Sequence, residues 1–401
     1  MRYLNTVGIV SEYNPFHYGH LYQIEETRKA LGKDAVVICV MSGDFVQRGE
    51  AAVFSKFARA EAACRCGADI VVELPLPWCL STAETFASGA VDILASMGCT
   101  HISFGSECGD VSALCELTDF LLDDSVRTEI TKLLRNDKTL SYARARQNVI
   151  KEFRPRYADL LDKANNILAV EYIKAIKKNH PELIPFTVKR IGSGHDKTGD
   201  KGPKSASEIR EMLLKGESTA GLIPPEAQKI FMKESEEGRL GDPDVMETAL
   251  RSRLLMLDAE YYETLPDASD GAGKRLYKAI RNGSTLTEAV CSASSKIYTL
   301  SRMRRMLLCA AFGISAEYTK EAPPYTRLLA VSKNGREYLK KIQKEYRIPL
   351  ITKPASVRFL NEKCMKVFAL GASAHDLYSM QFMTKNDRLP GEDWRKGPTV
   401  V

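Results

Sequence analysis

Residues 8–20 read GIVSEYNPFHYGH, and this stretch passes from an apolar run into a turn and then into a helix. The run Val7–Val10 is typical of a buried strand, Asn14-Pro15 is a turn signal, and residues 21–31 are amphipathic. The pattern His17-x-Gly19-His20 therefore falls at the N-terminus of the predicted helix. Free N–H groups and a partial positive charge attract phosphate to such a terminus, and Gly19 lets a ligand approach the backbone. We interpret this stretch as a phosphate site.

The alternation of strand and helix continues through residues 1–107. Apolar runs at 35–41, 69–74 and 100–105 predict three further strands, with helices over 55–66 and 82–97 between them. This pattern predicts an α/β fold with a doubly wound, parallel sheet. Ligands in such folds bind at the carboxyl ends of the strands, so the loops after these strands should converge there.

The remainder of the chain divides into two further parts. Helices are predicted over 111–121, 125–135, 141–153 and 167–179, and we expect this helical insertion, about 110–180, to pack over the open end of the sheet. A strand at 183–191 and a helix after Ser205 then complete a first domain, 1–222. Pro224-Pro225 marks the junction to a second, mostly helical and basic domain, 223–401. Within it, residues 328–352 predict a small α/β piece, and the tail from Arg388 is expected to be loose.

Composition and charge restrict the class of protein. The 401 residues are 44% hydrophobic and 27% charged, and they contain no long uncharged apolar run and no signal-peptide layout. The ten cysteines form no C-x-x-C pair, which favours reduced, buried thiols. We therefore expect a cytoplasmic protein with no membrane partner. Residues 301–401 carry a net charge of +10, whereas the whole chain carries +6, so the other residues together are slightly negative. This uneven charge indicates either a polyanionic partner or a solvated basic face.

Two motifs together resemble those of the nucleotidyltransferase superfamily. The first is the H-x-G-H element, and the second is KSASEIR at 204–210, which is similar to I-S-S-T-x-I-R except at Lys204 and Ala206. Longer stretches, at 11–20, 41–50, 104–107 and 165–172, resemble the bacterial tRNA(Met) cytidine acetate ligase family, and the likeness extends over essentially the whole chain.

The resemblance implies a nucleotidyltransferase-type, HIGH-type Rossmann-like fold and a two-step reaction. Acetate and ATP would give acetyl adenylate and pyrophosphate, and the acetyl group would then pass to the wobble cytidine of elongator tRNA(Met) with release of AMP. ATP is the implied cofactor, with magnesium expected beside it, and acetate and the tRNA are the implied partners. The implied ATP site comprises Val10, Ser11, Glu12, Tyr13, Asn14, Pro15, Phe16, His17, Tyr18, Gly19, His20, Leu21, Tyr22, Gln23, Gly105, Asn165 or Asn166, Arg190, Ser205, Ser207 and Arg210.

Several side chains have chemistry suited to the reaction. His17 and His20 can meet charge that develops on the triphosphate. Lys56 is either a clamp for phosphate or acetate or an ordinary surface lysine. Asp44 could hold magnesium or ribose, or simply cap a loop. Gln47 and Arg48 could reach acetate or the tRNA, or belong to a mobile loop.

The alternative reading of Ser205 is structural, because Ser205 and Glu208 also fit a capping box. Arg302, Arg304 and Arg305 are candidate contacts to the tRNA backbone, and the target base is expected to stack on an aromatic side chain.

Two other functions are compatible with the N-terminal motifs. One is a small-molecule adenylyltransferase of the cofactor-synthesis type, which would need neither the long C-terminal half nor its positive charge. The other is a non-catalytic protein that binds ATP and RNA, which would not need both histidines. The sequence leaves open the oligomeric state, the acetate pocket, the choice between Asn165 and Asn166, and the general base for the cytidine amine.

Overall fold

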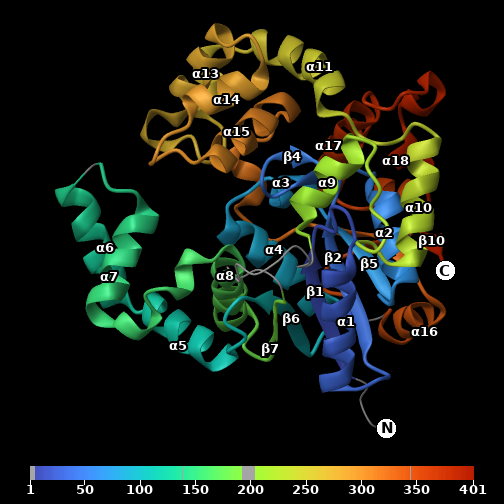
Figure 1. The fold of residues 1–401 in the computed structure, drawn as a ribbon, viewed down its shortest axis with the longest axis horizontal. Coiled ribbons are helices and arrows are strands. Elements are labelled where there is room, and N and C mark those ends of the chain that lie inside the picture. The colour runs from blue at the N-terminus through green and yellow to red at the C-terminus, as the bar shows by residue number, and fades with distance from the viewer. Residues whose placement is uncertain (1–4, 138, 192–203, 344) are drawn as a thin grey trace.

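A computed structural model describes residues 5–137, 139–191, 204–343 and 345–401, and it has an eight-stranded sheet at its centre (Figure 1). The strands of this sheet are β1 (Thr6–Ser11), β2 (Val36–Ser42), β5 (Ile70–Leu74), β6 (His101–Ser106), β7 (Ile184–Lys189), β8 (Thr326–Val331), β9 (Leu350–Ile351) and β10 (Thr399–Val400). A separate hairpin is formed by β3 (Phe45–Val46) and β4 (Glu50–Ala51).

The order of the sheet is β10-β8-β5-β2-β1-β6-β7, with β9 paired to β8. The five strands from β5 to β7 are mutually parallel, which confirms the predicted mainly parallel α/β sheet. The order of the strands reverses at β1: the chain passes from β1 to β2 and β5 on one side, and then returns to β6 and β7 on the other side of β1. Such a switch point opens a crevice at the carboxyl ends of the strands, and the residues 8–20 studied above leave β1 at that point.

Helices cover both faces of the sheet because its central strands are apolar on both sides. In β2, Val37, Cys39 and Met41 face one core, while Val36, Ile38 and Val40 face the other. The helices of this part of the chain are α1 (Tyr18–Leu31), α2 (Lys56–Arg65), α3 (Leu76–Cys79), α4 (Ala83–Ser96), α9 (Ala206–Leu214) and α10 (Pro225–Glu236). Helices α1, α2 and α10 share the first core, and α4 lies in the second.

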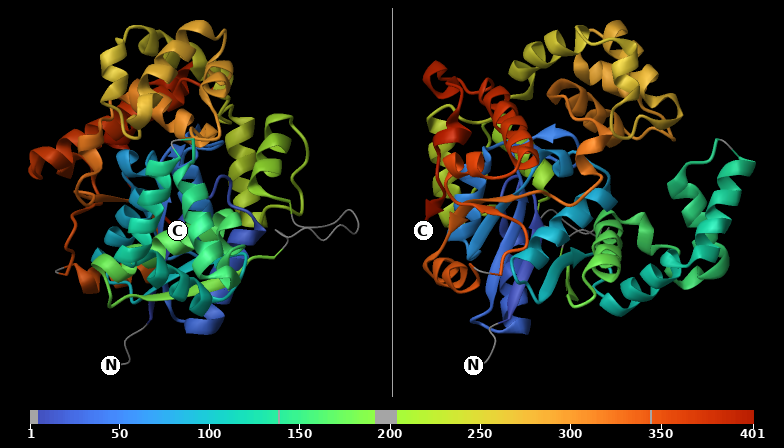
Figure 2. Two further views of the ribbon diagram at one scale, coloured as in Figure 1. Left: turned by 90° about the vertical axis from the view of Figure 1, so that its left-hand side faces the viewer. Right: turned by 180° about the vertical axis from the view of Figure 1, so that it is seen from behind.

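The insertion consists of α5 (Val111–Leu122), α6 (Asp124–Asn136), α7 (Tyr142–Phe153) and α8 (Ala164–Asn179). It packs differently from our expectation. Helix α8 lies against α4 and contacts β6 and β7, whereas α6 and α7 stand apart from the sheet (Figures 1 and 2). The insertion therefore covers the sheet through α8 rather than as a whole. Helix α8 also begins three residues before the predicted start, so Asn165 and Asn166 belong to its first turn.

The C-terminal half contributes both a helical bundle and part of the sheet. Its helices are α11 (Pro243–Leu255), α12 (Ala259–Glu263), α13 (Ala272–Asn282), α14 (Leu286–Ala293), α15 (Leu300–Phe312), α16 (Lys333–Ile342), α17 (Glu362–Ser379) and α18 (Glu392–Arg395). Helices α11 to α15 enclose a core of their own, which reaches the hairpin through Phe45, whose ring centroid is 4.7 Å from that of Phe312.

Residues 328–352 do not form a separate α/β piece. Strand β8 pairs antiparallel with β5, and β9 and β10 pair with β8, so these residues extend the central sheet. Every residue of β8 is buried, and a strand so apolar needs partners on both faces. The tail also differs from our expectation, because α18 is ordered against α17 and Asp393 is buried. Of the described helices, none combines the length and apolar character needed to cross a membrane.

Candidate active site at the switch point of the sheet

The two histidines close the N-terminus of α1. His17 is the N-cap residue, and its Nδ1 accepts a hydrogen bond from the N–H of Gly19 at 2.9 Å. His20 Nδ1 accepts from the N–H of His17 at 3.2 Å, and the two rings stack with centroids 3.8 Å apart. A Cβ on Gly19 would lie 2.7 Å from His17 Cε1, so glycine makes room for this ring. The motif is thus a reciprocal cap in which both imidazoles are held by their Nδ1 atoms.

This arrangement determines what the imidazoles can donate. Because each Nδ1 accepts, each neutral ring carries its proton on Nε2, and both Nε2–H groups are donors. Burial, with the positive charge of Arg190, lowers the pKa of His17 to about 4 and that of His20 well below its ordinary value. Both rings are therefore neutral near pH 7, and arginines must supply the positive charge at this site.

A cavity of about 210 Å³ lies beside His20 at the carboxyl ends of β1 and β6. Its walls come from the β1 loop, α1, the loop before Gly49, α4, β6, α8, the end of β7 and α9. They comprise Val10, Ser11, Glu12, Tyr13, Asn14, His20, Gln23, Gln47, Arg48, Phe86, Phe104, Gly105, Asn165, Leu168, Tyr172, Arg190, Ala206 and Arg210. Thirteen of these residues belong to the predicted site, so segments distant in sequence converge as the topology requires.

Other members of the predicted loop lie outside the lining of the cavity. Pro15, Phe16, Tyr18, Gly19, Leu21 and Tyr22 fall in this group, together with His17, which supports the ring of His20. Phe16 is fully buried and lies edge-on to Tyr13. The cavity contains donors suited to an anion, because Arg48, Arg190 and Arg210 reach it from different elements.

Arg59 organises the loops of the site, although nothing in its sequence context marked it. Its side chain is fully buried in α2 and donates only to backbone carbonyls. The acceptors are the carbonyls of Glu12 after β1, Ser42 at the end of β2, Gly43 after it, and Phe54. One guanidinium thus ties together the ends of two adjacent strands, which positions Glu12. The Glu12 carboxylate accepts from the N–H of Gln47 at 2.8 Å, and burial raises its pKa.

The two adjacent asparagines have different environments. Asn166 is 2% exposed, and its side chain bonds the N–H groups of Glu107 and Cys108 and the carbonyl of Leu160. Asn165 lines the cavity, and its Nδ2 donates to Glu107 at 2.7 Å. Asn166 therefore holds the loop after β6, whereas Asn165 is available to a ligand.

Exchanging each asparagine for alanine should separate these roles. We expect Asn165→Ala to raise the dissociation constant for ATP about fivefold, since one neutral hydrogen bond contributes about 1 kcal/mol. Asn166→Ala should instead lower the free energy of unfolding by about 1–3 kcal/mol, because it leaves buried N–H groups without an acceptor. Calorimetric titration with ATP and urea denaturation of both variants measure the two effects. The assignment fails if Asn166→Ala weakens ATP binding more than Asn165→Ala at unchanged stability.

In the segment 204–210, Arg210 lines the cavity, whereas Ser205 and Ser207 do not. Ser205 caps α9 through a reciprocal bond with Glu208, as the alternative reading had it. Ser207 Oγ accepts from Arg210, whose Nη1 also donates to the carbonyl of Asn14 at 2.9 Å. Arg210 thus reaches the cavity, while the two serines lie outside its lining. At Gly105, a Cβ would stand 3.3 Å from Cγ of Arg190, so the small residue lets the arginine cross the end of β6.

Lys56 and Asp44 lie in a buried ion cluster rather than on the cavity. The Lys56 ammonium is 2.6 Å from Asp393 and 2.9 Å from Glu73, and Asp44 bonds His375 at 2.8 Å. Burial alone would lower the pKa of Lys56, but the carboxylates outweigh it and raise the pKa. His375 is subject to the same balance, and Asp44 and Asp393 raise its pKa to about 10. Because Asp44, Glu73 and Asp393 already neutralise the Lys56 ammonium, this group is not available to bind a phosphate.

The three arginines of α15 make contacts within the chain that the sequence did not indicate. Arg302 donates to the carbonyls of Asp267 and Ser269, Arg304 pairs with Glu50, and Arg305 is buried beside Asp267. Their positive charges hold the bundle together and join it to the hairpin. All three guanidinium groups thus make contacts within the chain, Arg302 and Arg304 remain partly exposed, and their role in binding tRNA stays a prediction.

The described residues contain no group of three or more histidine, cysteine or acidic side chains that could hold a metal ion. Asp44, the residue considered for magnesium, is committed to His375 and to the backbone of Lys56. Mg²⁺ commonly binds through substrate phosphates and only one or two carboxylates. Magnesium therefore stays a prediction, and we expect its ligands to come mainly from the phosphates of the nucleotide.

Known proteins match nearly the whole chain. The model of the HIGH Nucleotidyl Transferase family matches residues 4–392. The tRNA(Met) cytidine acetate ligase of Acetivibrio thermocellus is 33% identical over 99% of this chain and 100% of its own length. That of Thermoanaerobacter sp. (strain X514) is 36% identical over 98% of each chain.

Two solved structures of Thermotoga maritima TmcAL also superpose on the fold. The apo form has a TM-score of 0.92 at 30% identity, and the form bound with alpha-thio ATP has a TM-score of 0.91 at 30% identity. Each comparison covers 99% of this chain and 100% of the other. The likeness therefore includes the sheet, the insertion and the helical bundle together.

Proposed function

This chain belongs to the HIGH nucleotidyl transferase family and, within it, to the tRNA(Met) cytidine acetate ligases, and from that premise we propose that it acetylates the wobble cytidine of elongator tRNA(Met) in two steps. The substrates would be acetate, ATP and the tRNA, with acetyl adenylate as the intermediate. The observation that carries the proposal is the pair of neutral, Nδ1-held imidazoles at a helix N-terminus, beside Arg190 in the cavity at the switch point.

In the first step an acetate oxygen attacks the α-phosphorus of ATP. The bond from that phosphorus to the oxygen bridging to the β-phosphate breaks, and pyrophosphate leaves with the electron pair. Such a reaction needs alignment and neutralisation of charge more than a protein nucleophile. The Nε2–H of His20, the guanidinium of Arg190 and the N-terminus of α1 are suited to the charge that develops on the phosphates. Arg48 and Gln47 stay candidates for acetate.

In the second step the exocyclic amine of the cytidine attacks the acetyl carbon of the adenylate. The bond from that carbon to the phosphate oxygen breaks, AMP leaves, and the amine releases one proton to solvent. No protein thiol is needed as a carrier, because the adenylate is already activated. Arg48 and Arg210 line this cavity and are candidate cations for the tRNA backbone.

The decisive experiment mixes labelled acetate, ATP and unmodified elongator tRNA(Met) with the enzyme and analyses the tRNA nucleosides by mass spectrometry. We expect label in acetylcytidine, and none without ATP. A stable adenylylated small molecule formed without tRNA would instead favour the cofactor-synthesis alternative. If no label enters the tRNA while ATP and tRNA both bind, the protein would be a non-catalytic binder.

A further inference from the structure

The nucleotide cavity is lined by two groups of charged side chains. Arg190 belongs with the two histidines at the start of α1, since its positive charge lowers the pKa of both imidazoles. Glu12 belongs with Arg48 and Arg210, whose positive charges lower its pKa. The first group has the donors that suit the phosphates of ATP. The second group therefore borders the part of the cavity that is left for the acyl group and the incoming cytidine.

The Glu12 carboxylate is held at one oxygen and open at the other. Its Oε1 accepts from the N–H of Gln47 at 2.8 Å, and the Glu12 carbonyl is held by Arg59. Its Oε2 makes no hydrogen bond with the described residues, and it is not among the unpaired polar atoms that are sealed from solvent. Because Glu12 is partly exposed and lines the cavity, this free oxygen is available to a substrate there.

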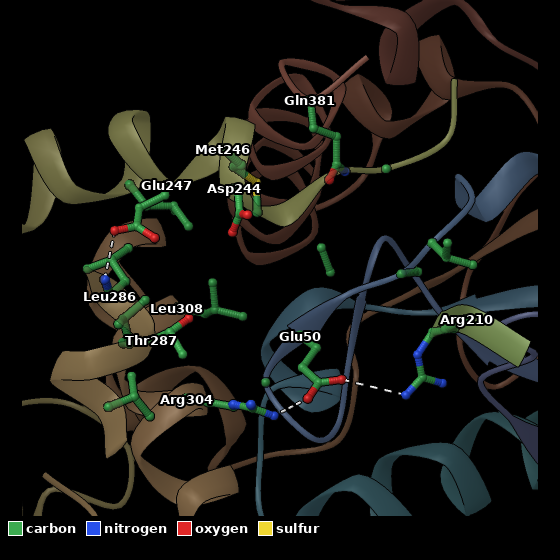
Figure 3. A pocket seen from close by; sticks show the side chains of 18 of the residues that line it. Glu50, Arg210, Asp244, Met246, Glu247, Leu286, Thr287, Arg304, Leu308 and Gln381 are labelled. Atoms are coloured by element: carbon green, nitrogen blue, oxygen red, sulfur yellow. Dashed lines mark hydrogen bonds and ion pairs between the residues drawn. The ribbon is translucent and has the colours of Figure 1, made fainter. Parts of the chain in front are cut away.

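The N–H of Gln47 is itself fixed, because the hairpin that carries it is anchored on both sides. Arg304 of the bundle pairs with Glu50 of β4, and Glu50 also lies 3.8 Å from Arg210 of α9 (Figure 3). In the turn, Arg305 Nη1 donates to the Gln47 carbonyl at 3.5 Å. The carboxylate that Gln47 holds is thus presented to the cavity in one orientation, as a group that acts on a substrate requires.

Among the described titratable side chains that line the cavity, Glu12 is the one that can accept a proton near neutral pH. The arginines are permanently protonated. The Nδ1 of His20 is occupied by the N–H of His17, its Nε2 carries the proton, and its pKa is well below the ordinary value. Burial raises the pKa values of Tyr13 and Tyr172, so both phenols stay protonated and are poor bases.

The surroundings of Glu12 set its strength as a base. Burial raises the pKa of Glu12 above its ordinary value and outweighs four groups that lower the pKa, namely the N–H of Gln47 and the charges of Arg48, Arg59 and Arg210. Two further titratable groups lie near its charge and are neutral near pH 7, because burial raises their own pKa values; they are Tyr172 and Cys79. A carboxylate whose pKa is raised binds a proton more readily than an exposed one, which suits general base catalysis.

We propose that Glu12 is the general base of the second step and takes the proton of the cytidine amine as the acetyl group is transferred. The inference rests on the proposed function. The exocyclic nitrogen attacks the acetyl carbon, the bond from that carbon to the phosphate oxygen breaks, and AMP leaves with the electron pair. The N–H proton passes to Oε2 of Glu12 and from there to solvent. Because the lone pair of this nitrogen is delocalised into the ring, the amine is a weak nucleophile, and removal of its proton lowers the barrier.

Glu12→Gln tests this role, because the amide keeps the size of the side chain and an oxygen for the N–H of Gln47 but cannot take a proton. Single-turnover acetyl transfer to the tRNA is compared with acetate-dependent exchange of pyrophosphate into ATP, measured without tRNA. We expect transfer to fall about a hundredfold or more, the usual contribution of a general base, and exchange to stay within about threefold of the wild type. Glu25→Gln is the matched control, at an exposed position of α1 that does not line the cavity, and should keep both rates.

The pH dependence of transfer is a readout that a purely structural role would not change. Glu12 acts only when it is ionised, so transfer by the wild type should decrease as the pH falls through its raised pKa. In Glu12→Gln this decrease should disappear, which leaves only the protonation of the cytidine ring at lower pH. Glu12→Asp keeps a carboxylate at a changed distance, so it should recover part of the transfer rate together with the acidic decrease.

The outcomes that would overturn the proposal are distinct. Transfer by Glu12→Gln within about threefold of the wild type would remove the need for this base. A parallel loss of exchange and transfer in both Glu12 variants, with ATP still bound in calorimetric titration, would assign the carboxylate to the first step. The same pH profile of transfer in the wild type and in Glu12→Gln would also contradict it. The proposed function is judged separately, by whether the wild-type protein acetylates the tRNA at all.

Discussion

Replacement of His20 by alanine is expected to lower acetate-dependent exchange of pyrophosphate into ATP by about a hundredfold, the usual loss when one preorganised donor to a charged transition state is removed. His20 lines the nucleotide cavity, and its Nδ1 is held by the N–H of His17. Its Nε2–H is consequently aimed without rotational freedom, and because its pKa is well below the ordinary value the ring donates in one protonation state near neutral pH.

The effect should lie in the rate of adenylate formation more than in the affinity for ATP. Charge on the leaving pyrophosphate grows only in the transition state, so a donor placed there lowers kcat when it is lost. His101→Ala is the matched control, because His101 begins β6 at the opposite end of the strand from the cavity. A His20→Ala enzyme with exchange within threefold of the wild type would remove His20 from the chemistry.

Lys56→Met should lower the free energy of unfolding by about 3–5 kcal/mol, the range observed when one partner of a buried ion pair is removed. The side chain of Lys56 is 2% exposed and that of Asp393 is 3% exposed, and their charged atoms are 2.6 Å apart. Methionine would fill much of the volume but would leave Asp44, Glu73 and Asp393 without this countercharge. Three carboxylates in a medium of low dielectric would then repel one another.

Urea denaturation of the wild type and the variant measures this loss. Lys29→Met serves as the control, because Lys29 is exposed and its contact to Glu26 is 3.3 Å long, so a change below about 0.5 kcal/mol is expected. In an Asp393→Asn background the cost of Lys56→Met should shrink, since part of the unpaired charge is then gone. An unchanged unfolding free energy together with a raised KM for ATP would restore Lys56 as a phosphate clamp.

The sheet and the nucleotide cavity followed from local patterns. Apolar runs flanked by turn residues placed β1, β2, β5 and β6, since the burial of a parallel strand on both faces requires such runs. The carboxyl edge of a parallel sheet then brings its loops together whatever the helices between them are. The topology predicted that the loops after these strands converge, whereas the family resemblance assigned Glu12, Gly105 and Arg190 to one site, and all three line the same cavity.

Charged residues of the second half were assigned less well. Arg302, Arg304 and Arg305 form a basic run, which is typical of nucleic-acid binding when it is exposed. In the folded chain their partners, Asp267 and Glu50, come from other elements. A count of charges in sequence cannot find such pairs, because the cost of burying an unpaired charge makes the partner a consequence of packing.

The sequence by itself determined the capped start of α1, because His17, Gly19 and His20 lie within four residues and their reciprocal cap depends only on local backbone geometry. Only the tertiary structure decided that Lys56 meets Asp393, 337 residues away, and that Arg59 ties two strand ends together. These contacts are long-range, and they arise because buried charges and amides must find partners wherever packing leaves them.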